Sequence, residues 1–157
     1  MPGTDMKLEN EIGMATFRSP FQKAYLNILY TGNWLEARVE SLIKPFGISP
    51  EQYNVLRILR GQHGKPINLY EVQERMLSRM SNATRLVEKL RLKALVTREI
   101  CEQNRRKVEI AITPKGLDLL NELDPLVEEQ EKTLFKHIDA AEVEALSNVL
   151  DRLRGVE

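Results

Sequence analysis

Polar and basic side chains gather in two short stretches in the middle of the chain. They are Arg79, Ser81, Asn82, Thr84, Arg85 and Lys89 in the first stretch, and Arg105 and Arg106 in the second. Asn can pair bidentately with adenine and Arg with guanine, whereas Lys and Ser commonly bind phosphates. Asn82, Arg85 and Lys89 are spaced three and four residues apart, which places them on one face of a helix. This pattern predicts contacts with double-stranded DNA, with a helix in the major groove.

The second stretch is expected at the tip of a two-stranded hairpin. Apolar residues alternate with others over 107–112, which is typical of a strand, and a less regular strand is expected over 95–101. The turn between these strands carries Arg105 and Arg106. Adjacent cations at a loop tip have little structural use, so we predict that they contact the minor groove or the DNA backbone.

Caps and apolar periodicity predict the helices that must position both stretches. Ser49 and Gln52 are spaced as a capping box, with Ile48 and Tyr53 as the hydrophobic staple around it. We expect helices over 19–44, 50–61, 69–76, 79–92, 114–137 and 140–154. Pro125 lies inside the fifth of these, where it removes a hydrogen bond, so we expect a kink or a break there.

Two of these helices form a helix-turn-helix pattern. The short 69–76 helix is followed by a tight turn at 77–78 and then by the 79–92 helix. The apolar residues of this last helix are expected to face the core, with Leu86 beside them. They are Met80, Ala83, Val87 and Leu90. Together with the hairpin, the pattern predicts a winged helix-turn-helix in a mainly α (α+β) fold.

The charge distribution favours a DNA-facing surface although the formal net charge is zero. Residues 75–107 include ten basic and three acidic residues, a net charge of about +7. Residues 117–157 carry a net charge of about −7. The length of 157 residues allows one domain with a core, and an aromatic content of 6% favours helices packed by aliphatic side chains.

The remaining residue types form no pattern for catalysis, a cofactor or a metal. His63 and His137 lie far apart without ligands at metal spacing, and no nucleophile–base pair is present, so we expect no enzymatic activity. Cys101 is the only cysteine, which excludes an intramolecular disulfide and favours a reducing compartment. Because no apolar run suits a signal peptide or a membrane helix, we expect a cytoplasmic protein.

Several motifs resemble the MarR family (multiple antibiotic resistance regulators) of bacterial transcription regulators. They are the run Ser81–Leu90, the pair Leu95-Val96, Arg98, the wing residues Asn104-Arg105-Arg106 and the run Ile112–Gly116. The resemblance implies a homodimer with interleaved first and last helices and a winged helix-turn-helix on each subunit. It also implies a pseudo-palindromic operator and regulation of transcription as a ligand-responsive repressor, with release by a small molecule or by oxidation.

Apolar stripes on the outer helices agree with a dimer. Leucines and valines at helical spacing line the segments 114–137 and 140–154. A single subunit is not expected to cover all of this apolar surface. We therefore expect residues 1–48, a tail and a helix, and residues 114–157 to form a dimerisation domain, and residues 49–113 to form the DNA-binding lobe. Burial within a single chain is the alternative. Residues 1–17 are weakly periodic and are expected to be mobile, or ordered only against a partner.

The chain departs from the family pattern at two positions. Asn104 stands where the family usually has Asp, and it offers only neutral hydrogen bonds to hold the wing tip. Ala94 stands where the family usually has Gly before the first strand, and a positive φ there would strain Ala.

Alternative interpretations exist for parts of this pattern. The basic face also suits a winged-helix protein-interaction module with an acidic partner. Cys101 is interpreted as an ordinary half-buried thiol rather than a redox switch or a nucleophile. Five aromatic residues either border an effector pocket between the dimer helices and the DNA-binding lobe or pack in the core. They are Tyr25, Tyr30, Trp34, Tyr53 and Tyr70.

Overall fold

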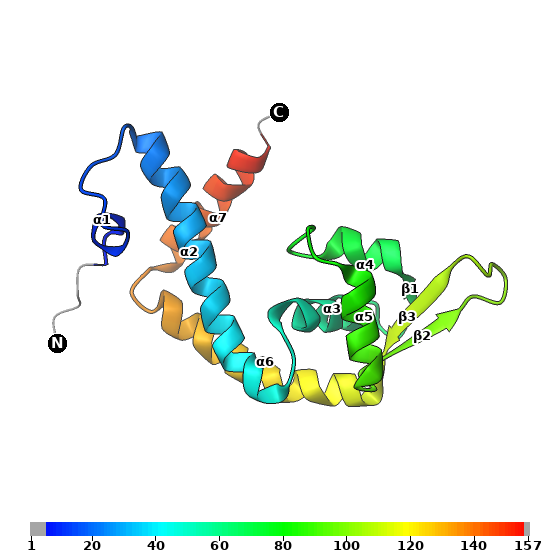
Figure 1. Ribbon diagram of the computed structural model, residues 1–157. Coiled ribbons are helices and arrows are strands. Elements are labelled where there is room, and N and C mark those ends of the chain that lie inside the picture. Colours follow the sequence, from blue (N-terminus) through cyan, green and yellow to red (C-terminus); the bar gives the residue numbers. More distant parts are fainter. Residues whose placement is uncertain (1–5, 156–157) are drawn as a thin grey trace.

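The computed structural model describes residues 6–155 and places them in two lobes that are joined by a long helix (Figure 1). In chain order the helices are α1 (Leu8–Glu11), α2 (Pro20–Ile43), the 3-10 helix η1 (Lys44–Phe46), α3 (Pro50–Arg60), α4 (Leu69–Arg75), α5 (Ala83–Leu92), α6 (Pro114–Phe135) and α7 (Ala140–Arg154). The strands are β1 (Ile67–Asn68), β2 (Val96–Ile100) and β3 (Val108–Ile112). The predicted mainly α fold with a small sheet is confirmed.

Local caps begin most of these helices, as the sequence predicts. The side chains of Ser49, Asn68 and Asp139 each accept a hydrogen bond from the backbone N–H three residues later. The side chain of that later residue in turn accepts one from the backbone N–H of the cap residue. These capping boxes satisfy donors that a helix N-terminus otherwise leaves free. Ser19 and Thr113 cap α2 and α6 through their hydroxyl groups.

The three strands form one antiparallel sheet in the order β1-β3-β2. β2 pairs with β3 along its whole length, with Val96 opposite Ile112 and Ile100 opposite Val108. β1 pairs Ile67 with Ile110. The sequence analysis missed β1, because two residues are too short for a periodic pattern. The pairing covers one edge of β3 and leaves β2 as the outer strand of the wing.

The winged lobe has its own core, which lies between α3, α4, α5, the sheet and the first half of α6. The largest fully buried side chains are Ile43, Val55, Leu56, Leu59, Val72, Val87, Leu90, Ile110, Leu120 and Leu123. Burial of such a side chain contributes about 1.5–3 kcal/mol relative to exposure. Because Ile43 ends α2 within this core, the lobe holds the end of α2 as well as α5.

Of the kink or break expected at Pro125, the break is wrong, because α6 is continuous from Pro114 to Phe135. Leu123 and Val127 on either side of Pro125 are buried. The packing of these side chains outweighs the loss of one backbone hydrogen bond, because tertiary contacts contribute most of the stability of a helix in a protein.

The two halves of α6 contact different lobes. In the first half, Asp124 accepts hydrogen bonds from both terminal nitrogens of Arg60 of α3, at 2.5 and 3.2 Å. In the second half, Gln130 Nε2 donates to the carbonyl oxygen of Arg38 in α2 at 3.2 Å. Figure 1 shows this half crossing α2 and leading to α7. α6 is therefore the rigid connection between the winged lobe and the outer helices.

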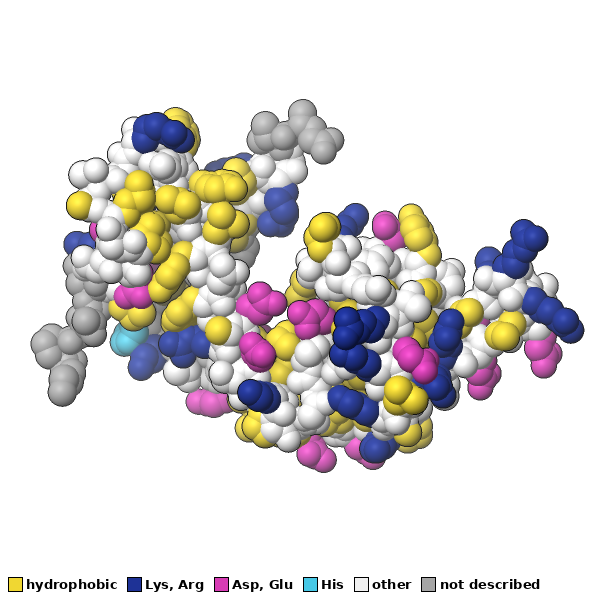
Figure 2. Space-filling model, viewed as in Figure 1, with side chains coloured by type: hydrophobic (Ala, Val, Ile, Leu, Met, Phe, Trp, Pro, Cys, Tyr) yellow, Lys and Arg dark blue, Asp and Glu magenta, His cyan; other side chains and the backbone are white. Residues whose placement is uncertain are grey.

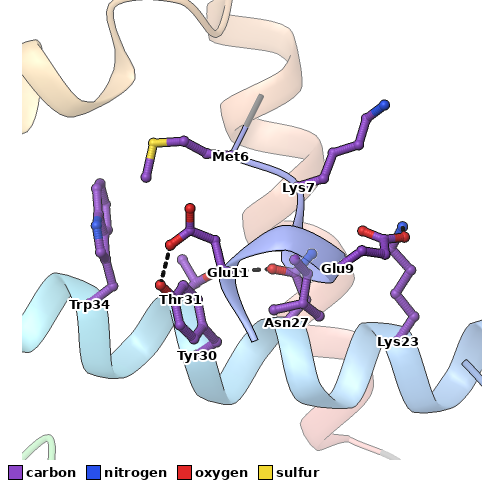
Figure 3. Close-up of a pocket in the computed structure, with 10 residues that line it drawn as sticks. Met6, Lys7, Glu9, Glu11, Lys23, Asn27, Tyr30, Thr31 and Trp34 are labelled. Atoms are coloured by element: carbon purple, nitrogen blue, oxygen red, sulfur yellow. Dashed lines mark hydrogen bonds and ion pairs between the residues drawn. The ribbon is translucent and has the colours of Figure 1, made fainter. Parts of the chain in front are cut away.

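The N-terminal segment folds back on α2 within the same chain. Leu8 is buried, Glu9 forms an ion pair with Lys23, and the Tyr30 hydroxyl donates to Glu11 at 2.6 Å (Figure 3). The hydrogen bond from Lys23 lowers the pKa of Glu9. The segment expected to be mobile, or ordered only against a partner, thus includes the helix α1, which the sequence did not predict and which packs on α2 of the same chain. Residues 1–5 lie outside the described part.

Candidate nucleic-acid interface

The candidate recognition helix α5 begins at Ala83, four residues later than the predicted start at residue 79. Asn82 is its N-cap, and its side-chain oxygen accepts the backbone N–H of Arg85 at 3.0 Å. Arg79 and Ser81 therefore lie in the preceding turn, where the Ser81 N–H donates to the carbonyl of Ser78 at 3.2 Å. The predicted start at 79 is wrong because Asn82 has an extended backbone and caps the first turn that follows it, so the helix starts after this residue.

Met80 is another correction, because it lies in this turn with 96% of its surface exposed instead of facing the core. The other expected core residues of the helix are confirmed. Ala83, Val87 and Leu90 are buried, and Leu86 is half-buried against them. These contacts orient α5, so that Thr84, Arg85 and Lys89 are exposed on its outer surface.

Two polar side chains that the sequence analysis missed hold the turn. Gln73 of α4 donates to the carbonyl of Arg79 at 2.8 Å and accepts the N–H of Ala83 at 3.1 Å. Asn54 of α3 accepts the N–H of Leu77 at 2.9 Å. Because these bonds replace the helical bonds that the turn lacks, the backbone from 77 to 83 has a defined path. No local sequence signal pairs residues so far apart in the chain.

The cations of the turn and of α5 differ in their pairing. Within residues 6–155, Arg79, Arg85 and Lys89 form no ion pair. Arg91 on the same helix instead forms a bidentate pair with Glu88, at 2.7 and 2.9 Å. The hydrogen bond from Arg91 lowers the pKa of Glu88, which keeps this carboxylate charged and matched to its partner. The unpaired cations are thus the ones available to phosphates or bases.

Asn104 holds the tip of the wing. Its side-chain oxygen accepts the N–H of Arg106 at 3.1 Å, and its carbonyl accepts the N–H of Lys107 at 2.8 Å. These are the neutral hydrogen bonds expected of Asn at this position. Arg105 and Arg106 are exposed and, among the described residues, form no ion pair. Figure 2 shows dark-blue basic side chains projecting from the protruding wing tip and covering part of the lobe beside it.

Ala94 ends α5 in a conformation that Gly adopts more easily. The N–H of Leu95 donates to the carbonyl of Leu90 at 3.0 Å, and the N–H of Ala94 to that of Arg91 at 2.9 Å. These two bonds form a Schellman motif, which requires a left-handed residue. Ala94 accordingly has a φ of 59°. The positive φ considered for this departure from the family pattern is confirmed.

Ala94→Gly is therefore expected to raise the free energy of unfolding by about 0.5–1 kcal/mol, because relief of the left-handed strain exceeds the extra entropy of Gly in the unfolded chain. Chemical denaturation of the purified variant measures this change. Ala83→Gly, at the first helical residue of α5, is the control and should be destabilising. A decrease for both variants would show that residue 94 is not strained.

The five aromatic residues lie at separate places in the single chain, and a pocket that includes the dimer helices of both subunits stays a prediction. Tyr53 is buried in the core, whereas Tyr25 and Tyr70 are exposed. Tyr30 and Trp34 line a cavity of about 330 Å³, which lies between α2 and the N-terminal segment (Figure 3). Their separation follows from their positions on different helices and faces.

The remaining chemical candidates have no geometric support as reactive centres. Cys101 is half-buried at the end of β2, as expected for an ordinary thiol. Within the described range 6–155, no group of three or more His, Cys, Asp or Glu side chains is arranged to hold a metal ion. In the same range, no helix has both the length and the apolar character to cross a membrane.

A helix-turn-helix with unpaired cations on its second helix, followed by a basic wing, defines a winged-helix DNA-binding protein. Residues 48–108 match the MarR family. The crystal structure of a MarR transcription factor from Planctomyces limnophilus is 32% identical and covers 87% of this chain and 98% of that chain, with a TM-score of 0.68. The chain therefore belongs to the MarR family and is a DNA-binding transcription regulator, not an enzyme.

Two further relatives agree with this assignment. The HTH-type transcriptional regulator MhqR of Bacillus subtilis (strain 168) is 28% identical over 111 residues, which cover 71% of this chain and 75% of MhqR. BpsR of Bordetella bronchiseptica, whose structure concerns regulation of its DNA binding by 6-hydroxynicotinic acid, is 22% identical. It covers 90% of this chain and 99% of its own, with a TM-score of 0.77, and thus has the same fold.

Proposed function

We propose that the protein binds a pseudo-palindromic operator as a homodimer and represses transcription until a small molecule releases it. The observation that carries this proposal is the set of unpaired cations on the turn, on α5 and at the wing tip. In the proposed complex Arg79, Ser81, Asn82, Thr84, Arg85 and Lys89 contact the major groove and its phosphates. Arg105 and Arg106 contact the minor groove or the backbone.

Exposed apolar side chains on the outer helices support the homodimer. On α2, Phe21 has 85% of its surface exposed, and Tyr25, Ile28 and Leu29 are also exposed. Leu146, Val149 and Leu153 are exposed on α7. Figure 2 shows yellow apolar side chains gathered on the lobe that α2 and α7 form. Apolar surface of this extent favours association, and a second copy would cover it by two-fold symmetry.

The domain boundaries that we propose follow from this arrangement. Residues 1–48 and 114–157 would form the dimerisation domain, and residues 49–113 the DNA-binding lobe. The two α5 helices of the dimer would then lie about 34–36 Å apart, the spacing of successive major grooves. Since α6 is anchored to α3 by Arg60 and Asp124, a change at the dimer helices would move the winged lobes as units.

A cavity beside α5 supports a way for an effector to act on DNA binding. It has a volume of about 600 Å³ and lies between the end of α2, the start of α3 and α5. Lys89 and Leu86 of α5 line it together with Gln52 and Glu40. Because Lys89 would also bind a phosphate, a ligand in this cavity would compete with DNA for it. Regulation of BpsR by a small molecule adds support by analogy.

Lys89→Ala is expected to weaken binding to all duplexes alike, because a phosphate contact carries no sequence information. The slope of log K against log salt should fall by about 1 per subunit. Fluorescence anisotropy over a range of salt concentrations measures the slope. Lys132→Ala in the second half of α6 is the control and should leave the slope unchanged. An unchanged slope for Lys89→Ala would remove this residue from the phosphate contacts.

Selection of bound duplexes from a random pool, combined with light scattering of the complex, tests the proposal as a whole. The expected result is an inverted repeat bound by two subunits, and reduced transcription from a promoter that contains it. A monomer in solution would contradict the homodimer. Failure to bind duplexes at low salt would contradict the proposed function and favour an acidic protein partner instead.

A further inference from the structure

Leu77 and Met80 are displayed on the surface of the helix-turn-helix turn. Leu77 has 92% of its surface exposed and Met80 has 96%, although both are large apolar residues. Their neighbour Met76 is buried in the core. A single exposed apolar residue needs no explanation, but two of them within one short turn form a local apolar surface.

The backbone that carries these side chains is held in place. The N–H of Leu77 is bound by Asn54, and the carbonyl of Arg79, beside Met80, is bound by Gln73. The two anchoring side chains come from α3 and α4, whose apolar residues belong to the core. The backbone that carries Leu77 and Met80 is therefore already ordered. A ligand that buries these side chains would not have to overcome the entropy cost of ordering the turn.

This apolar surface is continuous with the candidate DNA interface. Arg79 lies between the two residues, and Ser81 and the N-cap Asn82 follow directly. In helix-turn-helix proteins the N-terminal residues of the second helix approach the base edges in the major groove. The cations on this turn and on α5 would hold the DNA backbone there, which makes a nucleic acid a better occupant than a neutral protein surface.

We propose that Leu77 and Met80 contact the C5-methyl groups of thymine in the major groove and so contribute to sequence preference. The methyl group of thymine is the apolar feature of a base edge in this groove, and apolar side chains read it by contact. Met adapts its shape to such contacts because its side chain is unbranched and polarizable. This inference rests on the proposed operator binding and assigns readout to residues other than the polar and basic set.

Replacement of thymine by deoxyuridine tests the contact, because it removes only the methyl group. The probe is the duplex selected from the random pool, with each thymine replaced in turn. For the unmodified protein, Kd is expected to rise roughly fourfold at each thymine that is contacted, the value for one buried methyl group. Leu77→Ala and Met80→Ala should bind the thymine duplex more weakly and should lose this sensitivity at the contacted positions.

Leu92→Ala is the matched control, because Leu92 is also exposed but lies at the opposite end of α5. This variant should retain the full response to deoxyuridine. Thermal unfolding should be unchanged in all three variants, since none of the altered side chains is buried. Two results would overturn the inference and leave the proposed function intact. One is specific binding with no response to deoxyuridine, and the other is an equal response in Leu77→Ala, Met80→Ala and the unmodified protein. Absence of specific duplex binding would overturn the proposed function and this inference with it.

Discussion

Gly116→Ala is expected to lower the free energy of unfolding by about 3 kcal/mol. A Cβ atom at this position would lie 2.4 Å from the carbonyl oxygen of Leu95 and 2.7 Å from Cγ1 of Ile112. The first of these contacts is with backbone, which cannot rotate away. The first turn of α6 would have to separate from the start of β2, where the Thr113 N–H now donates to the Leu95 carbonyl at 3.1 Å.

Thermal unfolding should show this loss as a decrease in Tm of roughly 6–12 °C for a chain of this size. Gly61→Ala is the matched control. Its Cβ would lie 3.4 Å from the nearest atom, the Ile58 carbonyl oxygen, and its backbone has a φ of −62° that Ala adopts readily. A change in Tm for Gly116→Ala no larger than that of the control would show that the contact between α6 and β2 relaxes without cost.

The position of Gly116 connects stability to function. The segment from Leu95 to Ile112 forms the wing, and α6 leads from its base to the outer helices. The Thr113 hydroxyl donates to the carbonyl of Ala94 at 2.8 Å, so the end of α5 is joined to the same point. A variant that loosens this junction should weaken DNA binding as well as folding, because the recognition helix, the wing and α6 meet there.

Arg85→Ala is expected to weaken operator binding by about 1–3 kcal/mol per half-site, which is roughly a 5–150-fold factor in Kd for each half-site, and to relax the sequence preference. The Arg85 side chain is exposed in the first turn of α5, and it forms no ion pair within residues 6–155. Its guanidinium is thus free to pair bidentately with guanine. Anisotropy titrations with the selected operator and with a scrambled duplex measure both effects.

Arg91→Ala provides the control for the loss of one positive charge on the same helix. The guanidinium of Arg91 is already engaged by Glu88, so its removal should change operator affinity much less than the removal of Arg85 does. If Arg85→Ala weakened the operator and the scrambled duplex equally, Arg85 would be a backbone contact and not a base contact. Equal losses for Arg85→Ala and Arg91→Ala would indicate a general effect of charge.

The sequence by itself determined the features that depend on neighbours in the chain. Ser49 caps its helix as expected, and Asn68 and Asp139 cap theirs in the same way, because a capping box closes within four residues. The alternation over 107–112 marks β3 for a similarly local reason. The motif Ser81–Leu90 and the twin Arg at the wing tip indicated the family, which the comparisons then established.

Only the tertiary structure decided the path of the turn before α5 and the exposure of Met80. Helical spacing placed Met80 inside, but the helix begins after Asn82, and the turn before it depends on Gln73 and Asn54. Pro125 likewise remains within α6 because buried residues on both sides hold the helix together. The β1 pairing, the fold-back of α1 on α2 and the close contact at Gly116 are also long-range. Their energies come from partners far away in the chain, which periodicity and caps do not encode.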